Sequence, residues 1–371
     1  MYLIVLISIA IHSVYIGSKV VVSLLALELG AGQVVIGVLA ALYALVPLLL
    51  GVYSGRIADT TGMRAPMLAG ASCVGAAMLI GFFWNTLPAL FVVAVLVGTG
   101  FVFYNVSIQN LTGGYGSPGQ RARNFSMLSI GYSISTFIGP MTAGFTIDYA
   151  GHARAFLVFA LFTLLPIAVL AFNSRLTRVN VQPAPQDKRS ALDLLRIPAL
   201  RQLVIMSGLI VAAWDLFGFY VPIYAHSVGL SASSVGLILG AYAAAAFLSR
   251  FAMPRILQHW QGSQVMVGAM LLAACAFVAF PFFSMVYALM AIAFLIGLGL
   301  GCAQPLSMMM AYERSPAGRT GEVTGLRLTA NNVARIVIPI VAGTLGAALG
   351  TAPVFWISAL NLAVISWMSR R

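Results

Sequence analysis

The chain has 371 residues, of which 61% are hydrophobic and only 8% are charged, and its mean hydropathy is +1.00. A soluble domain carries about 25% charged residues, so this composition excludes a soluble enzyme, a DNA-binding module and a disordered protein. The formal net charge of +12 is not gathered on one soluble face, and it therefore indicates no nucleic-acid partner.

Long apolar runs recur along the whole chain, each of the length that a membrane helix needs. A helix needs about 20 apolar residues to cross a bilayer, so these runs predict an all-α polytopic membrane protein with about twelve spans. We place the spans at residues 2–27, 33–53, 67–84, 88–111, 124–147, 153–172, 201–225, 232–253, 264–281, 284–308, 322–348 and 352–368.

The basic residues are distributed unevenly between the two sides of the membrane. With the N-terminus inside, the inner segments hold all of the 20 Lys and Arg residues except Arg154, which is outside, and Lys19, Arg327 and Arg335, which fall within spans. This positive-inside pattern predicts that both chain ends are cytoplasmic. We expect a multi-pass protein of the cytoplasmic (inner) membrane of a bacterium.

The chain also aligns with itself, without gaps, at an offset of 199 residues. Gly30, Tyr43, Gly98, Pro140 and Gly144 meet Gly229, Tyr242, Gly297, Pro339 and Gly343. One constant offset in separate regions predicts two similar six-helix halves. We place an N-terminal bundle at 1–173, a polar cytoplasmic linker at 174–200 and a C-terminal bundle at 201–371. Two parallel repeats suit a protein that alternates access to a midplane site.

After the second predicted span the chain reads Gly55-Arg56-Ile57-Ala58-Asp59-Thr60-Thr61-Gly62-Met63-Arg64. This segment resembles the signature loop of the major facilitator superfamily, and the twelve spans, the repeat and the linker agree with that family. The resemblance implies a gating loop made by Gly55, Asp59, Gly62 and Arg64. In it, Asp59 would engage the N-terminus of the eleventh span and latch the inner gate. The alternative for Asp59 is an ordinary solvated charge.

The fifth predicted span carries Gly139-Pro140-Met141-Thr142-Ala143-Gly144. This segment is similar to the antiporter motif of the drug:proton antiporter branch of that family, with two departures. Ala143 replaces one of the motif's glycines, and Ala94 stands where such members usually have arginine, which argues against a standard proton relay. The kink residues Gly139, Pro140 and Gly144 permit close helix packing in either case.

Polar side chains within the spans are costly in lipid, and they usually face a cavity or a partner. Several recur at helical spacing, and the resemblance implies that spans one, four, seven and ten line a central cavity, with a contribution from the eleventh. The candidate cavity residues are His12, Tyr15, Lys19, Asn105, Gln109, Trp214, Asp215, Gln304, Asn331 and Arg335. Arg327 lies nearer the inner end of its span, and we expect it to reach the inner surface. The alternative is that Asp215 only neutralises Lys19 or Arg335, while the amides pack helices together.

These features predict a secondary transporter that moves a small solute by alternating access. No ATP-binding motif is present, so we expect gradient energy. The candidate proton carriers are Asp215, Glu28 and His12, of which Asp215 is the most deeply placed. The excess of Lys19 and Arg335 over Asp215 favours a small organic anion. The alternatives are a drug or multi-solute efflux antiporter, a membrane-embedded enzyme and a polytopic receptor. The expected partners are a small-molecule solute, protons and the lipid bilayer, and we expect a monomer without nucleic acid, cofactor or metal.

Overall fold

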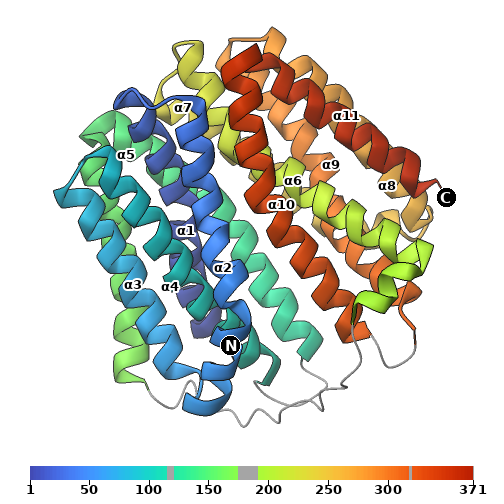
Figure 1. Cartoon of the computed structure of the whole chain (residues 1–371), viewed down its shortest axis with the longest axis horizontal. Helices are drawn as coiled ribbons and strands as arrows, with labels where there is room; N and C mark the ends of the chain where they lie inside the picture. Colours follow the sequence, from blue (N-terminus) through green and yellow to red (C-terminus); the bar gives the residue numbers. More distant parts are fainter. Residues whose placement is uncertain (115–120, 174–190, 317–319, 371) are drawn as a thin grey trace. The chain divides into compact units, whose positions relative to one another are not determined.

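The long apolar runs form helices because a chain in lipid must satisfy its backbone hydrogen bonds internally. The computed structural model describes residues 1–114, 121–173, 191–316 and 320–370, and every regular element in these ranges is helical. The long helices are α1 Tyr2–Glu28, α2 Gln33–Thr61, α3 Arg64–Phe83, α4 Leu87–Gly114, α5 Arg121–Phe172, α6 Pro198–Ser227, α7 Ala232–Ile256, α8 Gly262–Ala279, α9 Val286–Arg314, α10 Thr320–Leu349 and α11 Ala352–Ser369 (Figure 1). Two short 3-10 helices, η3 Ala191–Arg196 and η4 Phe280–Phe282, precede α6 and follow α8.

Helix α5 contains two membrane spans rather than one. Its 52 residues would extend for about 78 Å, more than twice the thickness of a bilayer core. The helix is broken at Gly151, whose φ of 84° and ψ of 167° are not helical. Glycine adopts this positive φ without the steric penalty of a side chain. The two parts of α5 correspond to the fifth and sixth predicted spans, so the prediction of twelve spans is confirmed within the described residues.

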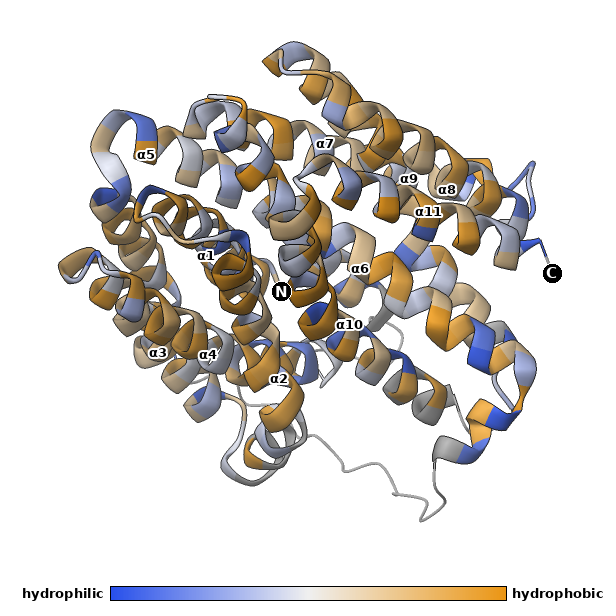
Figure 2. Cartoon of the chain, turned by 45° about the horizontal axis from the view of Figure 1, so that its top comes forward, coloured by the Kyte–Doolittle hydropathy of each residue, from blue (hydrophilic) through white to orange (hydrophobic). Residues whose placement is uncertain are grey.

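All of the long helices have the length and hydropathy of membrane spans, and the mean hydropathy of their best segments is between 1.4 and 2.7. Figure 2 shows apolar residues along the length of the helices, with hydrophilic residues mostly near the helix ends. The chain is therefore an all-α, multi-pass membrane protein.

The chain packs as two compact units that do not follow the repeat boundary everywhere. Unit 1 consists of Met1–Pro185 together with Ser231–Gly240, and unit 2 consists of Gln186–Leu230 together with Ala241–Arg371. Helix α7 thus begins in unit 1 and continues in unit 2. Of the expected linker 174–200, residues 174–190 lie outside the described residues, while η3 and the start of α6 occupy its end. The division at 173 and 201 stays a prediction.

The two halves of the chain repeat the same backbone geometry at the offset of 199 residues. Gly30 and Gly151 have positive φ values, and so do their counterparts Gly229 and Gly350. Helix pairing repeats as well: α1 packs on α5 and α3 on α4 in unit 1, as α6 packs on α10 and α8 on α9 in unit 2. The structure therefore confirms the pseudo-symmetric pair of six-helix bundles.

The expected signature loop is mostly helical, which corrects the predicted end of the second span at residue 53. Helix α2 continues through Gly55 and Asp59 to Thr61, and it ends only at Gly62, where φ is 79°. No proline interrupts α2 in this stretch, so the helix extends beyond its apolar part despite Gly55. The side-chain surroundings of Gly55 and Asp59 lie outside the described part of the structure.

Candidate functional site

Unit 1 holds an aromatic cluster built from α1, α4 and α5. The His12 ring is stacked on Tyr132, with 4.6 Å between the ring centroids, and the Tyr15 ring is stacked on Phe101 at 3.8 Å. The Tyr132 hydroxyl donates a hydrogen bond of 2.8 Å to Asn105 Oδ1. His12, Tyr15 and Asn105, which were predicted from their helical spacing, are therefore brought together.

Lys19 lies beside this cluster on α1. Its Nζ is 4.5 Å from the centroid of the Tyr15 ring and 5.7 Å from that of Tyr43. A cation over an aromatic face gains about 0.5–2 kcal/mol, with the larger values where water is excluded. The Tyr43 hydroxyl in turn donates to Ser18 Oγ at 3.3 Å. Two tyrosines therefore hold the ammonium group about 25 Å along α1 from Tyr2.

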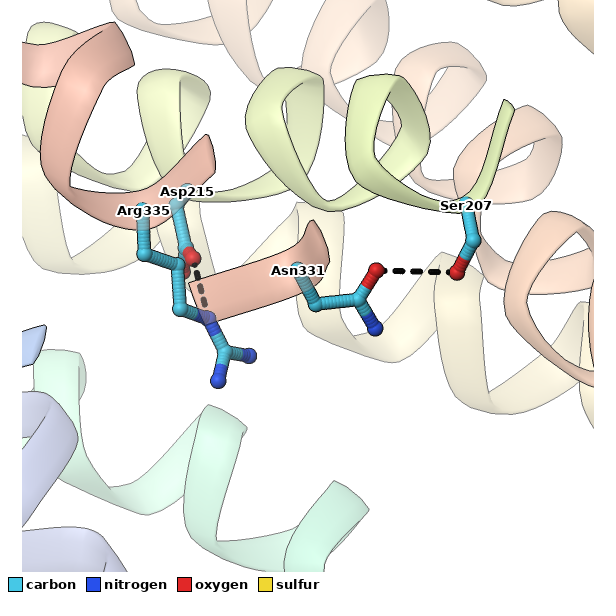
Figure 3. A network of polar contacts seen from close by, with 4 residues as sticks. All are labelled: Ser207, Asp215, Asn331 and Arg335. Atoms are coloured by element: carbon cyan, nitrogen blue, oxygen red, sulfur yellow. Dashed lines mark hydrogen bonds and ion pairs between the residues drawn. The ribbon is translucent and has the colours of Figure 1, made fainter. Parts of the chain in front are cut away.

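Unit 2 holds an ion pair between the middle of α6 and the middle of α10. Arg335 Nε donates to Asp215 Oδ2 at 2.8 Å, and the side chains are 37% and 21% exposed (Figure 3). Arg335 lies about 22 Å along α10 from Thr320, too deep to reach an interface easily. Of the two cations considered for Asp215, the one in contact with it is Arg335.

Asn331 lies one turn before Arg335 but has a different neighbour. It is 4% exposed, and its Oδ1 accepts a 2.9 Å hydrogen bond from the hydroxyl of Ser207 on α6 (Figure 3). If the amide is turned over, its nitrogen donates to Ser207 Oγ and to the backbone carbonyls of Ser207 and Arg327. In both orientations Asn331 joins α10 to α6, which is the helix-packing role that was kept as the alternative for the amides.

A further intramembrane arginine, which the sequence reasoning assigned to the inner segments, lies within α7. The Arg250 guanidinium carbon is 5.4 Å from the ring centroid of Trp214, and its Nε donates to the Gly301 carbonyl at 3.3 Å. The Trp214 ring is also 4.8 Å from that of Tyr242. The helix runs to Ile256 rather than to residue 253, so it continues for almost two turns beyond Arg250.

The repeat was the signal that could have added Tyr43 and Tyr242 to the predicted Tyr15 and Trp214. At an offset of 199 residues Tyr15 corresponds to Trp214, and Tyr43 corresponds to Tyr242. Each unit therefore has a cation beside a repeat-related aromatic pair, Lys19 in unit 1 and Arg250 in unit 2.

Two further candidates lie on the expected helices but outside these contacts. Gln109 is exposed on α4 and Gln304 is partly buried on α9, and neither contributes to the ring contacts or ion pairs described above. Arg327 is only 5% exposed, so the expectation that it reaches the inner surface is wrong. Helix α10 packs on α6 and on η3.

Of the expected gating residues, Gly62 and Arg64 have described side-chain surroundings. Gly62 ends α2, and Arg64 begins α3. Arg64 Nε donates to the Leu170 carbonyl at 2.7 Å, and its Nη2 donates to that of Ala171 at 2.6 Å. These are carbonyls of the last turn of α5, which have no partner within the helix, so Arg64 caps that helix end.

The kink residues position α5 against two neighbouring helices. A Cβ at Gly139 would lie 2.7 Å from the Ser13 carbonyl oxygen of α1. A Cβ at Gly144 would overlap the carbonyl of Ala232 in α7, and it would lie 3.2 Å from the Cα of Gly236. The two glycines therefore allow backbone-to-backbone contact on opposite sides of α5, next to Pro140.

Within the described residues, no group of three or more His, Cys, Asp or Glu side chains could hold a metal ion. The geometry provides aromatic faces, amides and cations within the spans, which are the kinds of group that line binding sites for organic molecules.

Comparison with known proteins agrees with this description. The sequence model of the Major Facilitator Superfamily matches residues 2–339. The tetracycline resistance protein, class B, of Escherichia coli is 24% identical over 327 residues, covering 82% of this chain and 77% of the relative. The staphylopine export protein of Staphylococcus aureus is 25% identical over 233 residues, covering 60% of this chain and 57% of the relative.

A solved structure of similar fold is that of a mutant of the nucleoside transporter NupG. It superposes with a TM-score of 0.81 at 14% identity, covering 100% of this chain and 98% of the other. At this level of identity the similarity concerns the fold alone.

Proposed function

Because the chain belongs to the Major Facilitator Superfamily, and is therefore a membrane transporter rather than an enzyme, we propose that it is a gradient-driven carrier of a small organic anion. The observation that carries the proposal is the partly exposed Asp215–Arg335 pair within the spans. Both six-helix halves would alternate access to the solute, and both chain ends would lie in the cytoplasm of a bacterium.

The balance of charge in the middle of the described spans supports an anionic solute. Lys19 and Arg335 are basic residues deep within spans, against Asp215 as the acid at comparable depth, whereas Arg250 lies less than two turns from the end of α7. Each embedded charge costs a few kcal/mol on insertion scales, and an anion that approaches the cations reduces this cost. Arginine also binds carboxylate and phosphate groups through two parallel hydrogen bonds.

The ion pair suggests how solute binding and proton movement are coupled. The side chains of Asp215 and Arg335 are partly exposed, so water or a solute reaches them. When the acidic group of a solute binds Arg335, the carboxylate of Asp215 loses its nearest positive charge. Asp215 would then be released to act as the proton carrier that the sequence predicts.

The aromatic rings would bind the organic part of the solute. Tyr15 and Phe101 present stacked rings in unit 1, and Trp214 and Tyr242 lie ring to ring in unit 2. Rings of this kind provide large apolar contact areas with few rotatable bonds.

The second candidate function is efflux of drug-like or several different solutes. It is favoured by the names of two relatives, a tetracycline resistance protein and a staphylopine export protein. A neutral or cationic drug would bind the aromatic faces and would not depend on Arg335.

The test is transport into proteoliposomes by the purified protein, after a thermal-shift screen of anionic and cationic solutes. We expect an anion to raise the unfolding temperature and to be transported. The variants Arg335→Gln and Lys19→Gln should each reduce transport at least about tenfold, because each removes a charged contact to the solute. Arg123→Gln is the matched control, since Arg123 is exposed in the first turn of α5. If both variants retain full transport and a cation is the solute carried, the anion proposal is wrong.

A further inference from the structure

The carboxylate of Asp148 binds the N-terminus of α7. Asp148 Oδ1 accepts a hydrogen bond of 3.0 Å from the backbone N–H of Ala232, and its Oδ2 accepts one of 2.7 Å from that of Ser233. The first N–H groups of a helix have no partner within the helix, and this end carries a partial positive charge. Asp148 therefore provides a cap from another helix, because it belongs to the first part of α5.

Asp148 ends a row of close contacts between α5 and the start of α7. Pro140, Gly144 and Asp148 follow one another at intervals of four residues, which places them on one face of α5. Across from them, a Cβ at Gly236 would lie 2.9 Å from the carbonyl oxygen of Pro140. The helices are thus in backbone contact up to the carboxylate, and all of these residues belong to unit 1.

At the offset of 199 residues the chain repeats the proline and glycine of this face but not the carboxylate. Pro140 and Gly144 recur at the offset of 199 as Pro339 and Gly343, whereas the counterpart of Asp148 is Ala347. The helix that corresponds to α7 is α2, and its N-terminus has no side-chain cap. At this position the acid is therefore present in one half of the chain only.

Exposure of Asp148 makes its bonds to α7 reversible. The Asp148 side chain is exposed, so water replaces the two backbone donors when α7 moves away from the carboxylate. Breaking the contact leaves no buried charge without a partner, which would otherwise cost several kcal/mol. The adjoining pair at this end, His152 Nδ1 and Glu28 Oε2 at 2.7 Å, connects α5 to α1 and does not involve α7.

We propose that Asp148 and the backbone N–H groups of Ala232 and Ser233 form a latch, the Asp148 latch, that opens once in each transport cycle. The first residues of α7 pack with unit 1 and the rest with unit 2, so release of the latch frees α7 to move with unit 2. This inference rests on the proposed alternating-access function. It predicts that weakening the latch favours the state in which Ser231–Gly240 leave unit 1.

The test measures distances between two spin labels, one on each unit, in protein reconstituted without solute. Exposed Trp84 and His226 are replaced by cysteine for labelling, in a background in which Cys73, Cys275 and Cys302 are alanine. Asp148→Asn should increase about fivefold the ratio of molecules with a long distance between the two labels to molecules with a short one. A fivefold change is the effect typical of losing one N-cap interaction. Glu28→Gln removes a neighbouring acid that does not touch α7, and it should leave the distribution unchanged.

A second pair of variants tests the same bonds from α7. Ser233→Pro removes the N–H that donates to Asp148 and is compatible with the first turn of a helix, whereas Ser233→Ala keeps this N–H. Ser233→Pro should shift the distribution in the same direction as Asp148→Asn, and the double variant should shift it by less than the sum of the two. Ser233→Ala should have the smaller effect.

The outcomes separate this inference from the proposed function. If Asp148→Asn and Ser233→Pro are folded and both keep the wild-type distances, there is no latch, whichever solute is carried. If the distances shift as expected but no anionic solute is transported, the latch stands and the anion proposal fails.

Discussion

The Asp215–Arg335 pair places two opposite charges at a depth where either alone would be costly. The bond of 2.8 Å joins α6 to α10, and one turn away Asn331 joins the same helices through Ser207. The two contacts differ in exposure, because Asn331 is 4% exposed whereas the side chains of the ion pair are 21% and 37% exposed. The amide is thus suited to packing, and the ion pair to exchange with a solute.

We expect Asp215→Asn and Arg335→Gln each to lower the stability of the purified protein by about 1–3 kcal/mol, because each removes one member of the ion pair and leaves the other charge in place. The double variant Asp215→Asn/Arg335→Gln should be less destabilised than the sum, because neither charge of the pair remains. Thermal unfolding of the four proteins forms a double-mutant cycle, and a coupling of zero would mean that the pair does not contribute to stability.

The same aspartate should determine the coupling to protons. In proteoliposomes, Asp215→Asn should transport solute without accompanying proton movement, since asparagine does not titrate. Proton movement is measured with a pH-sensitive dye inside the vesicles, alongside solute uptake. Unaltered proton movement in this variant would place the coupling group elsewhere.

At the scale of helices, α5 is the element on which unit 1 is assembled. Its first part is in backbone contact with α1 at Gly139 and with α7 at Gly144, and its second part ends at the carbonyls capped by Arg64. In lipid, helices associate through close packing rather than through the hydrophobic effect, so small residues determine where they meet. The glycines of the motif are explained by this packing, without any reference to antiport.

Replacing Gly144 by alanine should therefore destabilise the protein, although alanine is the better helix former. The added methyl group would overlap the carbonyl of Ala232, and overpacking of this kind costs about 1–3 kcal/mol. Gly268→Ala in α8 is the control, because no atom lies within 4 Å of a Cβ built there. Thermal unfolding should show a lower midpoint for Gly144→Ala and an equal or higher one for Gly268→Ala. Equal midpoints for both variants would contradict close packing at Gly144.

At the scale of the whole molecule, the chain is two pseudo-symmetric bundles with unequal additions. Positive-φ glycines and helix pairs recur at the offset of 199 residues. Asp148 and the Gly55–Arg64 segment, by contrast, lie in the first half, and the second has Ala347 and Gln258 in place of Asp148 and Asp59. Features present in only one copy of a repeat are the ones expected to control alternating access.

For the segment after the second span, the resemblance to the family predicts the effect of Asp59→Asn. Loss of an attraction of about 0.3–1 kcal/mol to a helix N-terminus should shift the protein about two- to fivefold toward inward-open states. Labelling of single cysteines from the cytoplasmic and the outer side measures this shift. Unchanged labelling on both sides would exclude a gating role for Asp59.

The sequence by itself determined the number of spans, their repeat and the membrane class, because these follow from local properties. Apolar length decides where a helix crosses lipid, and a constant offset between similar residues is independent of packing. The helical stripes also identified Tyr15, Lys19, Asp215 and Arg335 as embedded polar residues. Apolar length also placed Gly151 between two predicted spans, and the structure has a positive φ at this residue.

Only the tertiary structure decided which of these residues meet. That Arg335 contacts Asp215, that Asn331 binds Ser207, and that Tyr132 joins His12 depend on the rotation of each helix about its axis. That rotation is set by contacts between helices distant in sequence, such as those at Gly139 and Gly144. The cap on α7 by Asp148 has no local signal at all, because its partners are backbone N–H groups 84 and 85 residues away. Backbone groups are identical in every non-proline residue, so their pairing across helices is visible only once the helices are packed.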